Sequence, residues 1–152
     1  MPKHTIQQRL PYTPEQVYQL VADIEKYPEF LPWCAAARIL RRSGDTVTAD
    51  LVIKFKAFQE KYTSNVVMHP PEGDVPGHVD VSLLHGPFTH LENKWQFSAD
   101  PEGCLVDFYI DFRFKSPLLE KMIGFMFDKA FLKMVEAFSE RAEDLYGKTR
   151  VE

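Results

Sequence analysis

The stretch that most constrains the fold runs from Ser116 to Tyr146, where apolar residues recur at helical spacing over about 30 positions. Ser116 is a favoured N-cap residue, Pro117 suits the first helical position, and Gly147 can end the helix. At 1.5 Å per residue such a helix is roughly 45 Å long, and its charged residues are too frequent for a bilayer span. Since one broad face is apolar, the helix needs a large apolar partner.

That face contains three methionines and three phenylalanines, which form a soft and adaptable surface. Such a stripe is typical of ordinary core packing, and it also suits an apolar ligand. Both interpretations stay open at the level of the sequence.

Composition limits the classes of function. The chain has 152 residues, 45% of them hydrophobic, which predicts a single domain over residues 1–152 with a substantial core. A net charge of -4 argues against generic DNA binding. Cys34 and Cys104 lack metal-ligand spacing, and neither an apolar leader nor a run of 18 apolar residues occurs. We therefore expect a reduced cytoplasmic protein, at most peripheral to the inner membrane.

Two local signals precede the strands. Thr13, Pro14 and Gln16 form a capping box that opens a short amphipathic helix ending near Glu25. The next segment, Tyr27–Cys34, reads YPEFLPWC and holds two prolines and three aromatic residues. Because prolines at this spacing suit neither a helix nor a strand, we predict an apolar loop that other elements must cover.

From Ala37 to Phe114 the hydrophobic period changes to two, and Pro- and Gly-rich turns divide the stretch into five or six antiparallel strands. A further strand is expected at His4–Leu10. The predicted fold class is α+β, with a curved antiparallel sheet wrapped around the long C-terminal helix and a core or cavity between them.

Two runs carry a family resemblance. Val21–Cys34 (VADIEKYPEFLPWC) and Met134–Gly147 (MVEAFSERAEDLYG) resemble the coenzyme Q-binding START-domain family, whose bacterial members are also called ribosome-association toxin A. The resemblance covers nearly the whole chain and extends to a superfamily that shares the helix-grip fold with polyketide cyclases and lipid-transfer proteins. It implies an apolar tunnel that holds ubiquinone or a similar polyprenyl quinone or lipid. It also implies a non-catalytic role in cellular respiration, with no covalently bound cofactor.

The expected ligand-binding residues come from two sources. The resemblance places Phe30, Leu31 and Trp33 near the tunnel mouth. Strand parity and the helix face add further lining residues: Phe55, Phe108, Ile110, Phe112, Met122, Met126, Phe127 and Met134. The candidates for recognising a polar head group are Tyr27, Lys54, Tyr62 and Tyr109.

The sequence predicts no catalytic or metal site. The five histidines are scattered without ligand spacing. Asp107 and Asp111 share the polar side of the last strand and are expected to face water. Cys34 lies in an apolar loop, where a lone cysteine behaves as a small hydrophobe. Cyclase-like chemistry on small aromatic substrates stays open as an alternative.

A second alternative is a ribosome-associated factor that binds the large subunit and blocks subunit association. Two basic clusters, each also consistent with a solvated sheet face, could contact phosphates. They are Arg38, Arg41 and Arg42, and Lys54, Lys56 and Lys61.

A third feature is a second stripe on the long helix. Leu118, Phe125 and Leu132 recur every seven residues outside the main apolar arc. We interpret this stripe as a docking surface for transient contact with a membrane or a partner. The alternative is that loops or the first helix cover it.

Overall fold

The computed structural model describes residues 3–31, 33–55 and 58–147. Within these ranges it describes every side chain except those of residues 3–4, 55, 58 and 123–132. The elements follow in the order β1 (Lys3–Leu10), α1 (Pro14–Ala22), the 3-10 helix η1 (Ile24–Glu29), β2 (Cys34–Ser43), β3 (Thr46–Phe55), β4 (Phe58–His69), β5 (Gly77–His85), β6 (Phe88–Asp100), β7 (Gly103–Phe114) and α2 (Pro117–Tyr146).

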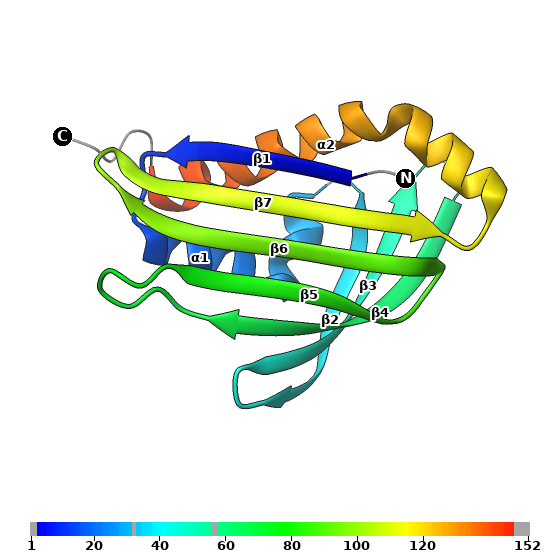
Figure 1. The fold of residues 1–152 in the computed structure, drawn as a ribbon, viewed down its shortest axis with the longest axis horizontal. Helices are drawn as coiled ribbons and strands as arrows, with labels where there is room; N and C mark the ends of the chain where they lie inside the picture. Colours follow the sequence, from blue (N-terminus) through cyan, green and yellow to red (C-terminus); the bar gives the residue numbers. More distant parts are fainter. Residues whose placement is uncertain (1–2, 32, 56–57, 148–152) are drawn as a thin grey trace.

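The strands form one antiparallel sheet in the order β1-β7-β6-β5-β4-β3-β2. β1 pairs with β7 at one edge, and α1 and η1 then carry the chain across to β2 at the other edge (Figure 1). Hairpins lead back from β2 to β7, and α2 follows. The predicted α+β class and the curved sheet with a long C-terminal helix are confirmed.

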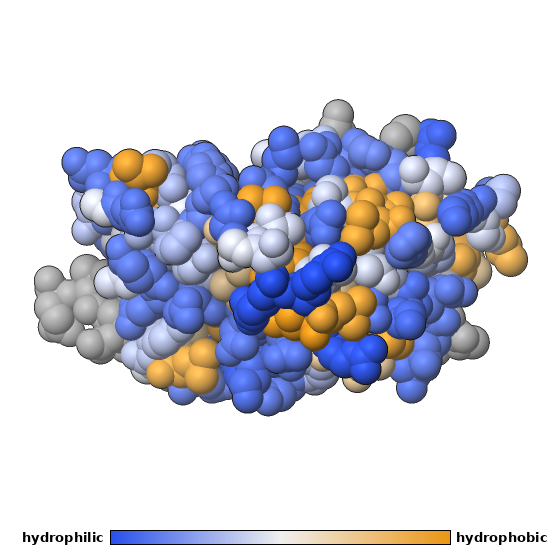
Figure 2. All heavy atoms as spheres, turned by 90° about the horizontal axis from the view of Figure 1, so that it is seen from below, coloured by the Kyte–Doolittle hydropathy of each residue, from blue (hydrophilic) through white to orange (hydrophobic). Residues whose placement is uncertain are grey.

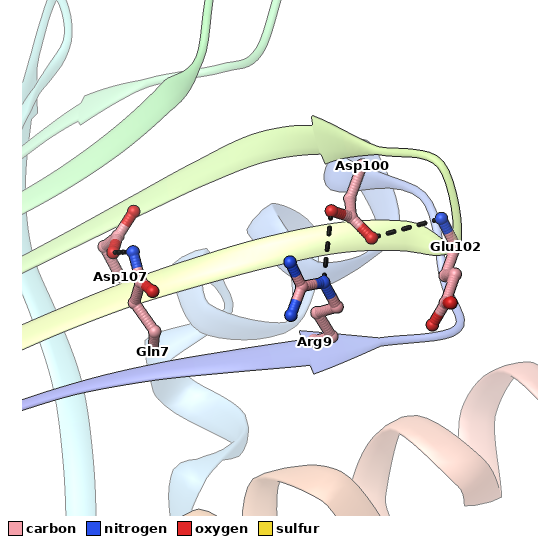
Figure 3. Close-up of polar contacts among 5 residues, drawn as sticks. All are labelled: Gln7, Arg9, Asp100, Glu102 and Asp107. Atoms are coloured by element: carbon pink, nitrogen blue, oxygen red, sulfur yellow. Dashed lines mark hydrogen bonds and ion pairs between the residues drawn. The ribbon is translucent and has the colours of Figure 1, made fainter.

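Side-chain contacts tie the edge strand β1 to β7 and to the turn before it (Figure 3). Gln7 Nε2 donates to Asp107 Oδ1 at 2.7 Å, and Arg9 Nε donates to Asp100 Oδ1 at 3.3 Å. The other oxygen of Asp100 accepts from the backbone N–H of Glu102 at 3.1 Å. Asp107 therefore helps to hold β1 against β7.

The predicted capping box at the start of α1 is confirmed. Thr13 Oγ1 accepts from the Gln16 backbone at 3.1 Å, while Gln16 Oε1 accepts from the Thr13 backbone at 3.0 Å. Such reciprocal bonds satisfy two N–H groups that the helix itself leaves without a partner. α1 nevertheless ends at Ala22, before the predicted end near Glu25.

The loop prediction for YPEFLPWC was wrong at its start, because Ile24–Glu29 forms η1 with Pro28 inside it. Asp23 leaves the α-helical conformation at ψ 68°. The chain then tightens to i to i+3 bonds, such as Lys26 N–H to the Asp23 carbonyl at 3.1 Å. A short helix loses little by including a proline, since the N–H groups of its first turn have no partner within the helix.

Helix α2 begins and ends as predicted. Ser116 Oγ accepts from the Leu119 backbone at 3.2 Å, which caps the first turn. At the other end, Tyr12 donates to the Gly147 carbonyl at 2.8 Å and Tyr146 donates to the Gln16 carbonyl at 2.9 Å. These two phenol bonds fasten the end of α2 to the start of α1.

Apolar side chains also reach the outer surface. On the face in Figure 2, a central apolar patch is crossed and bordered by hydrophilic side chains. Exposed apolar residues are common on folded proteins and are not by themselves a site. Within the described residues, neither α-helix combines the length and the apolarity needed to span a bilayer.

Candidate ligand cavity

A cavity of about 90 Å³ lies between the sheet and the helices. Its walls come from η1, from strands β3 to β7, and from α2, and its described lining contains no charged side chain. The lining residues are Ile24, Tyr27, Leu31, Trp33, Leu51, Tyr62, Ser64, Val66, Val79, Val81, Leu91, Asn93, Trp95, Phe108, Ile110, Met134 and Phe138. The site is therefore apolar with a few neutral polar groups, as is typical of small-molecule pockets.

The hydroxyl groups in this lining are held in their neutral, donating form. Burial raises the pKa of the Tyr27 and Tyr62 phenols well above the ordinary value. Tyr27 donates to the Val21 carbonyl, and its ring packs against Phe138 with ring centres 5.8 Å apart. Ser64, on β4 beside Tyr62, is almost fully buried. At neutral pH these groups are uncharged, and the Tyr27 O–H is already taken by the Val21 carbonyl.

Asn93 and Trp95 form a fixed pair on the inner face of β6. Trp95 Nε1 donates to Asn93 Oδ1 at 3.0 Å, while Asn93 Nδ2 donates to the Tyr109 carbonyl at 2.9 Å. The two bonds require opposite ends of the amide, so they determine its orientation. The indole is therefore held in place through Asn93.

A second and smaller cavity, of about 40 Å³, lies nearer α1 and β1. Its described lining is apolar except for Gln8 and Ser139. The lining residues are Ile6, Gln8, Leu10, Val17, Leu20, Val21, Trp95, Val106, Phe108, Met134, Val135, Phe138 and Ser139. Four residues line both cavities and separate them, and we call them the partition: Trp95, Phe108, Met134 and Phe138.

A family profile described as "Polyketide cyclase / dehydrase and lipid transport" matches residues 10–139, which is most of the chain. The chain belongs to this family. It is similar, at 40% identity over 136 residues, to the ribosome association toxin RatA of Rickettsia prowazekii, covering 90% of this chain and 92% of that protein.

Another relative in this family is the mitochondrial coenzyme Q-binding protein COQ10 homolog B of Xenopus laevis. It is 33% identical over 146 residues, which are 93% of this chain and 58% of that protein. A START superfamily protein from Mycobacterium smegmatis superposes with a TM-score of 0.73 at 19% identity, covering 95% and 97% of the two chains. The resemblance noted in the sequence and the START-like fold are confirmed. The two relatives are named for association and binding, whereas the family description also names cyclases.

Five of the residues expected to bind ligand line the larger cavity of this family member: Leu31, Trp33, Phe108, Ile110 and Met134. The placement of Phe108 and Ile110 follows strand parity, since both side chains point inward along β7. Their contact with a ligand stays a prediction. The side chains of Phe55, Met126 and Phe127 lie outside those that the structure describes.

Three expected lining residues lie elsewhere. Phe30 packs outside the larger cavity, with the Arg141 guanidinium 5.1 Å from its ring centre. Phe112 lines neither cavity and packs against Phe114 at 5.5 Å, in a cluster that fills the space there. Met122 is 40% exposed and lines neither cavity. The apolar face of α2 is thus wider than the surface that covers it.

Two of the four candidates for recognising a head group line the larger cavity and two do not. Tyr27 and Tyr62 line the larger cavity, but Lys54 is exposed and Tyr109 lies on the opposite parity of β7. Sequence reasoning missed the polar or partition residues Ser64, Asn93, Trp95 and Phe138. A signal was present for Asn93, because it stands at an apolar position of the alternating run Leu91, Asn93, Trp95 and Phe97.

The described lining of the larger cavity contains neither a cysteine nor a histidine. Burial raises the pKa of the Cys34 thiol to about 11, so it stays protonated at neutral pH and behaves as a small hydrophobe, as predicted. On the outer face, His90, Glu92 and Asp111 bring ligand atoms within 4.8 Å of one another. His90 lies 3.3 Å from Asp111, and Lys94 lies 3.4 Å from Glu92. The contact between His90 and Asp111 joins β6 to β7, whereas Lys94 and Glu92 pair along β6.

The surface predictions have mixed outcomes. Leu118 is 68% exposed, which is consistent with a docking stripe on α2, but the side chains of Phe125 and Leu132 lie outside those that the structure describes. Docking to a membrane therefore stays a prediction.

Proposed function

We propose that this protein binds an uncharged, mainly apolar ligand with a carbonyl-bearing ring, such as ubiquinone or a related polyprenyl quinone, and does not transform it. The observation that carries the proposal is the composition of the larger cavity. Its described lining is apolar and uncharged, and its polar groups are hydroxyls and amides. The similarity to a coenzyme Q-binding protein supports the same ligand class.

The chemistry of the lining favours a neutral acceptor of hydrogen bonds. A charged ligand would lose its hydration in this cavity without gaining a counter-charge. A quinone carbonyl, by contrast, accepts from a phenol or hydroxyl that would otherwise lose a partner when the site excludes water. The raised pKa values of Tyr27 and Tyr62 also make these phenols poor general bases near neutral pH. Both arguments favour binding over catalysis.

Purification from a quinone-producing host, followed by solvent extraction and mass spectrometry, is expected to yield an isoprenoid quinone in stoichiometric amount.

Tyr62→Phe should weaken the binding of a short-chain ubiquinone by up to about tenfold, because it removes one hydrogen bond and keeps the ring that packs on Phe88 at 5.5 Å. Quenching of the intrinsic tryptophan fluorescence measures the affinity. Tyr18→Phe is the matched control, since Tyr18 is buried outside the described lining of both cavities. Equal affinities of the Tyr62 variant and the original protein would contradict the proposal.

A second candidate function is association with the large ribosomal subunit, acting through the surface. It is favoured by the 40% identity to a ribosome association toxin. It is also favoured by the exposed side chains of Arg38, Arg41 and Arg42 on the edge strand β2. Their exposed guanidinium groups can donate hydrogen bonds to phosphates.

Gradient sedimentation tests this candidate. The original protein is expected to co-sediment with large subunits, and Arg38→Glu, Arg41→Glu and Arg42→Glu together should abolish the association, because like charges would replace three phosphate contacts. Lys115→Glu with Lys121→Glu is the control, since both lysines are exposed at the start of α2. Retained sedimentation of the triple variant would count against β2 as the contact surface.

A further inference from the structure

The outer face of the sheet carries three side chains of the kinds that bind metal ions, and they meet across one strand pair. His90 and Glu92 alternate with Leu91 on β6 and so share a face of the sheet, and Asp111 on β7 is the register partner of Glu92. One ligand atom from each residue lies within 4.8 Å of those of the other two. The spacing of histidines along the chain does not indicate this group, because strand pairing brings its members together.

The two carboxylates of this group stand directly opposite each other, which is unfavourable without a cation. Like charges at paired positions of neighbouring strands destabilise a sheet. The Asp111 side chain is only 15% exposed, and its Oδ1 is buried and accepts no hydrogen bond within the described part of the chain. A buried acceptor without a donor costs free energy, more so when it is charged. A cation bound by Asp111 and Glu92 would offset both effects.

One lysine already lies against this group. Lys94 Nζ is 3.4 Å from Glu92 Oε2, and the two side chains are 56% and 39% exposed. Exposed ion pairs of this kind contribute little stability, so a metal ion can displace Lys94 at small cost. Lys3 on β1 is the register partner of Asp111, and its side chain lies outside those that the structure describes.

The combination of one imidazole and two carboxylates selects the class of ion. Zn²⁺ binds both kinds of ligand at roughly 2.0–2.2 Å, and in tetrahedral coordination neighbouring ligand atoms are then roughly 3.4 Å apart. His90 Nε2 and Asp111 Oδ2 are already 3.3 Å apart. Glu92 is more exposed than Asp111 and can turn to close the remaining distance. Ca²⁺ and Mg²⁺ instead prefer ligand sets made of oxygen atoms alone.

We propose that His90, Glu92 and Asp111 bind one divalent transition-metal ion of the zinc class on the outer face of the sheet. The ligands are His90 Nε2 and one oxygen of each carboxylate, and water completes the coordination on the solvent side, where His90 is 46% exposed. The ion joins β6 to β7. The site lies on the opposite face of β6 from Leu91 and Asn93, which line the larger cavity, so it is independent of the proposed function.

Calorimetric titration of tag-free, chelator-treated protein with Zn²⁺ tests the site. The original protein is expected to bind one ion per chain, and its midpoint of thermal unfolding should rise with zinc and fall again with chelator. His90→Gln and Asp111→Asn should each lower the affinity at least about tenfold, since even residues that only support a metal ligand contribute about 10–100-fold. Lys94→Met should raise the affinity by up to about fivefold, because it removes the competing exposed ion pair.

His69→Gln is the matched control. His69 Nδ1 lies 3.5 Å from Asp45 Oδ2, so it is also a surface histidine beside an aspartate, but the described residues bring no third ligand atom to this pair. Its zinc affinity should equal that of the original protein.

Three outcomes would overturn the site. They are an unchanged affinity in both His90→Gln and Asp111→Asn, an equal loss in His69→Gln, and equal affinities for Ca²⁺ and Zn²⁺, which would mean that the imidazole is not a ligand. Thermal unfolding in chelator verifies that each variant is folded. If Asp111→Asn does not fold, His90→Gln decides, since the His90 side chain is 46% exposed and its replacement leaves the core intact.

Discussion

Gly103→Ala is expected to lower the free energy of unfolding by more than about 3 kcal/mol, because it combines backbone strain with a direct clash. Gly103 has φ +135°, and a Cβ there would lie 2.3 Å from the Leu10 carbonyl oxygen and 2.9 Å from the Tyr12 backbone nitrogen. Those backbone atoms cannot easily move away, since Leu10 pairs with Cys104 in the sheet and the Tyr12 hydroxyl is bonded to the end of α2. Equilibrium urea unfolding measures the loss.

Gly44→Ala is the matched control for this substitution. Gly44 also has a positive φ, +61°, but a Cβ there would meet no atom within 4 Å. Only the conformational cost of roughly 1–2 kcal/mol then applies. Similar losses at both positions would show that strain alone, and not the close approach of the chain leaving β1, makes glycine necessary at position 103.

Phe138→Ala is expected to lower the free energy of unfolding by about 3–5 kcal/mol, because it leaves a cavity in the core. The Phe138 ring contacts Phe30 and Trp95 at 5.2 Å and Tyr27 at 5.8 Å. It therefore joins α2 to η1 and to the sheet, and it lines both cavities. Removing it leaves a void where α2, η1 and the sheet meet. Thermal unfolding and hydrogen exchange of the α2 amides measure the effect.

The control for Phe138 is Leu118→Ala, on the same helix. Leu118 is 68% exposed, so its truncation should change the stability by no more than about 0.5 kcal/mol. If Phe138→Ala leaves α2 as protected from exchange as Leu118→Ala does, α2 is not held to the sheet through this aromatic contact.

The predicted helix starts agree with the structure because their causes are local. Ser116 and Pro117 open α2, and Thr13 and Gln16 open α1, each through bonds within three residues. Strand parity is equally local, so the buried side of β7 follows from alternation alone. The prediction failed where two local conformations compete, the α-helix and the 3-10 helix. α1 gives way at Asp23 to a 3-10 turn that packs against β2, and no residue pattern indicates how that competition is decided.

Of the cavity, the sequence could predict only the residues whose inward position follows from the alternation along a strand. Phe108 and Ile110 point inward because β7 is a strand with one buried face, and Asn93 could have been found as a polar residue at an inward position. The Asn93–Trp95 bond and the contact between Trp95 and Phe138 could not. They depend on side-chain rotamers and on how closely α2 approaches the sheet.

The sequence by itself determined where the two α-helices begin, the order of helices and strands, and the alternation of the strands, since caps and hydrophobic periods act within a few residues of the chain. Only the tertiary structure decided that two cavities lie between the sheet and the helices, that the described lining of the larger one carries no charge, and that Met122 lies outside both. A cavity is what remains after elements distant in the chain have packed together. A small change in their separation opens or fills it, and no local pattern encodes that distance.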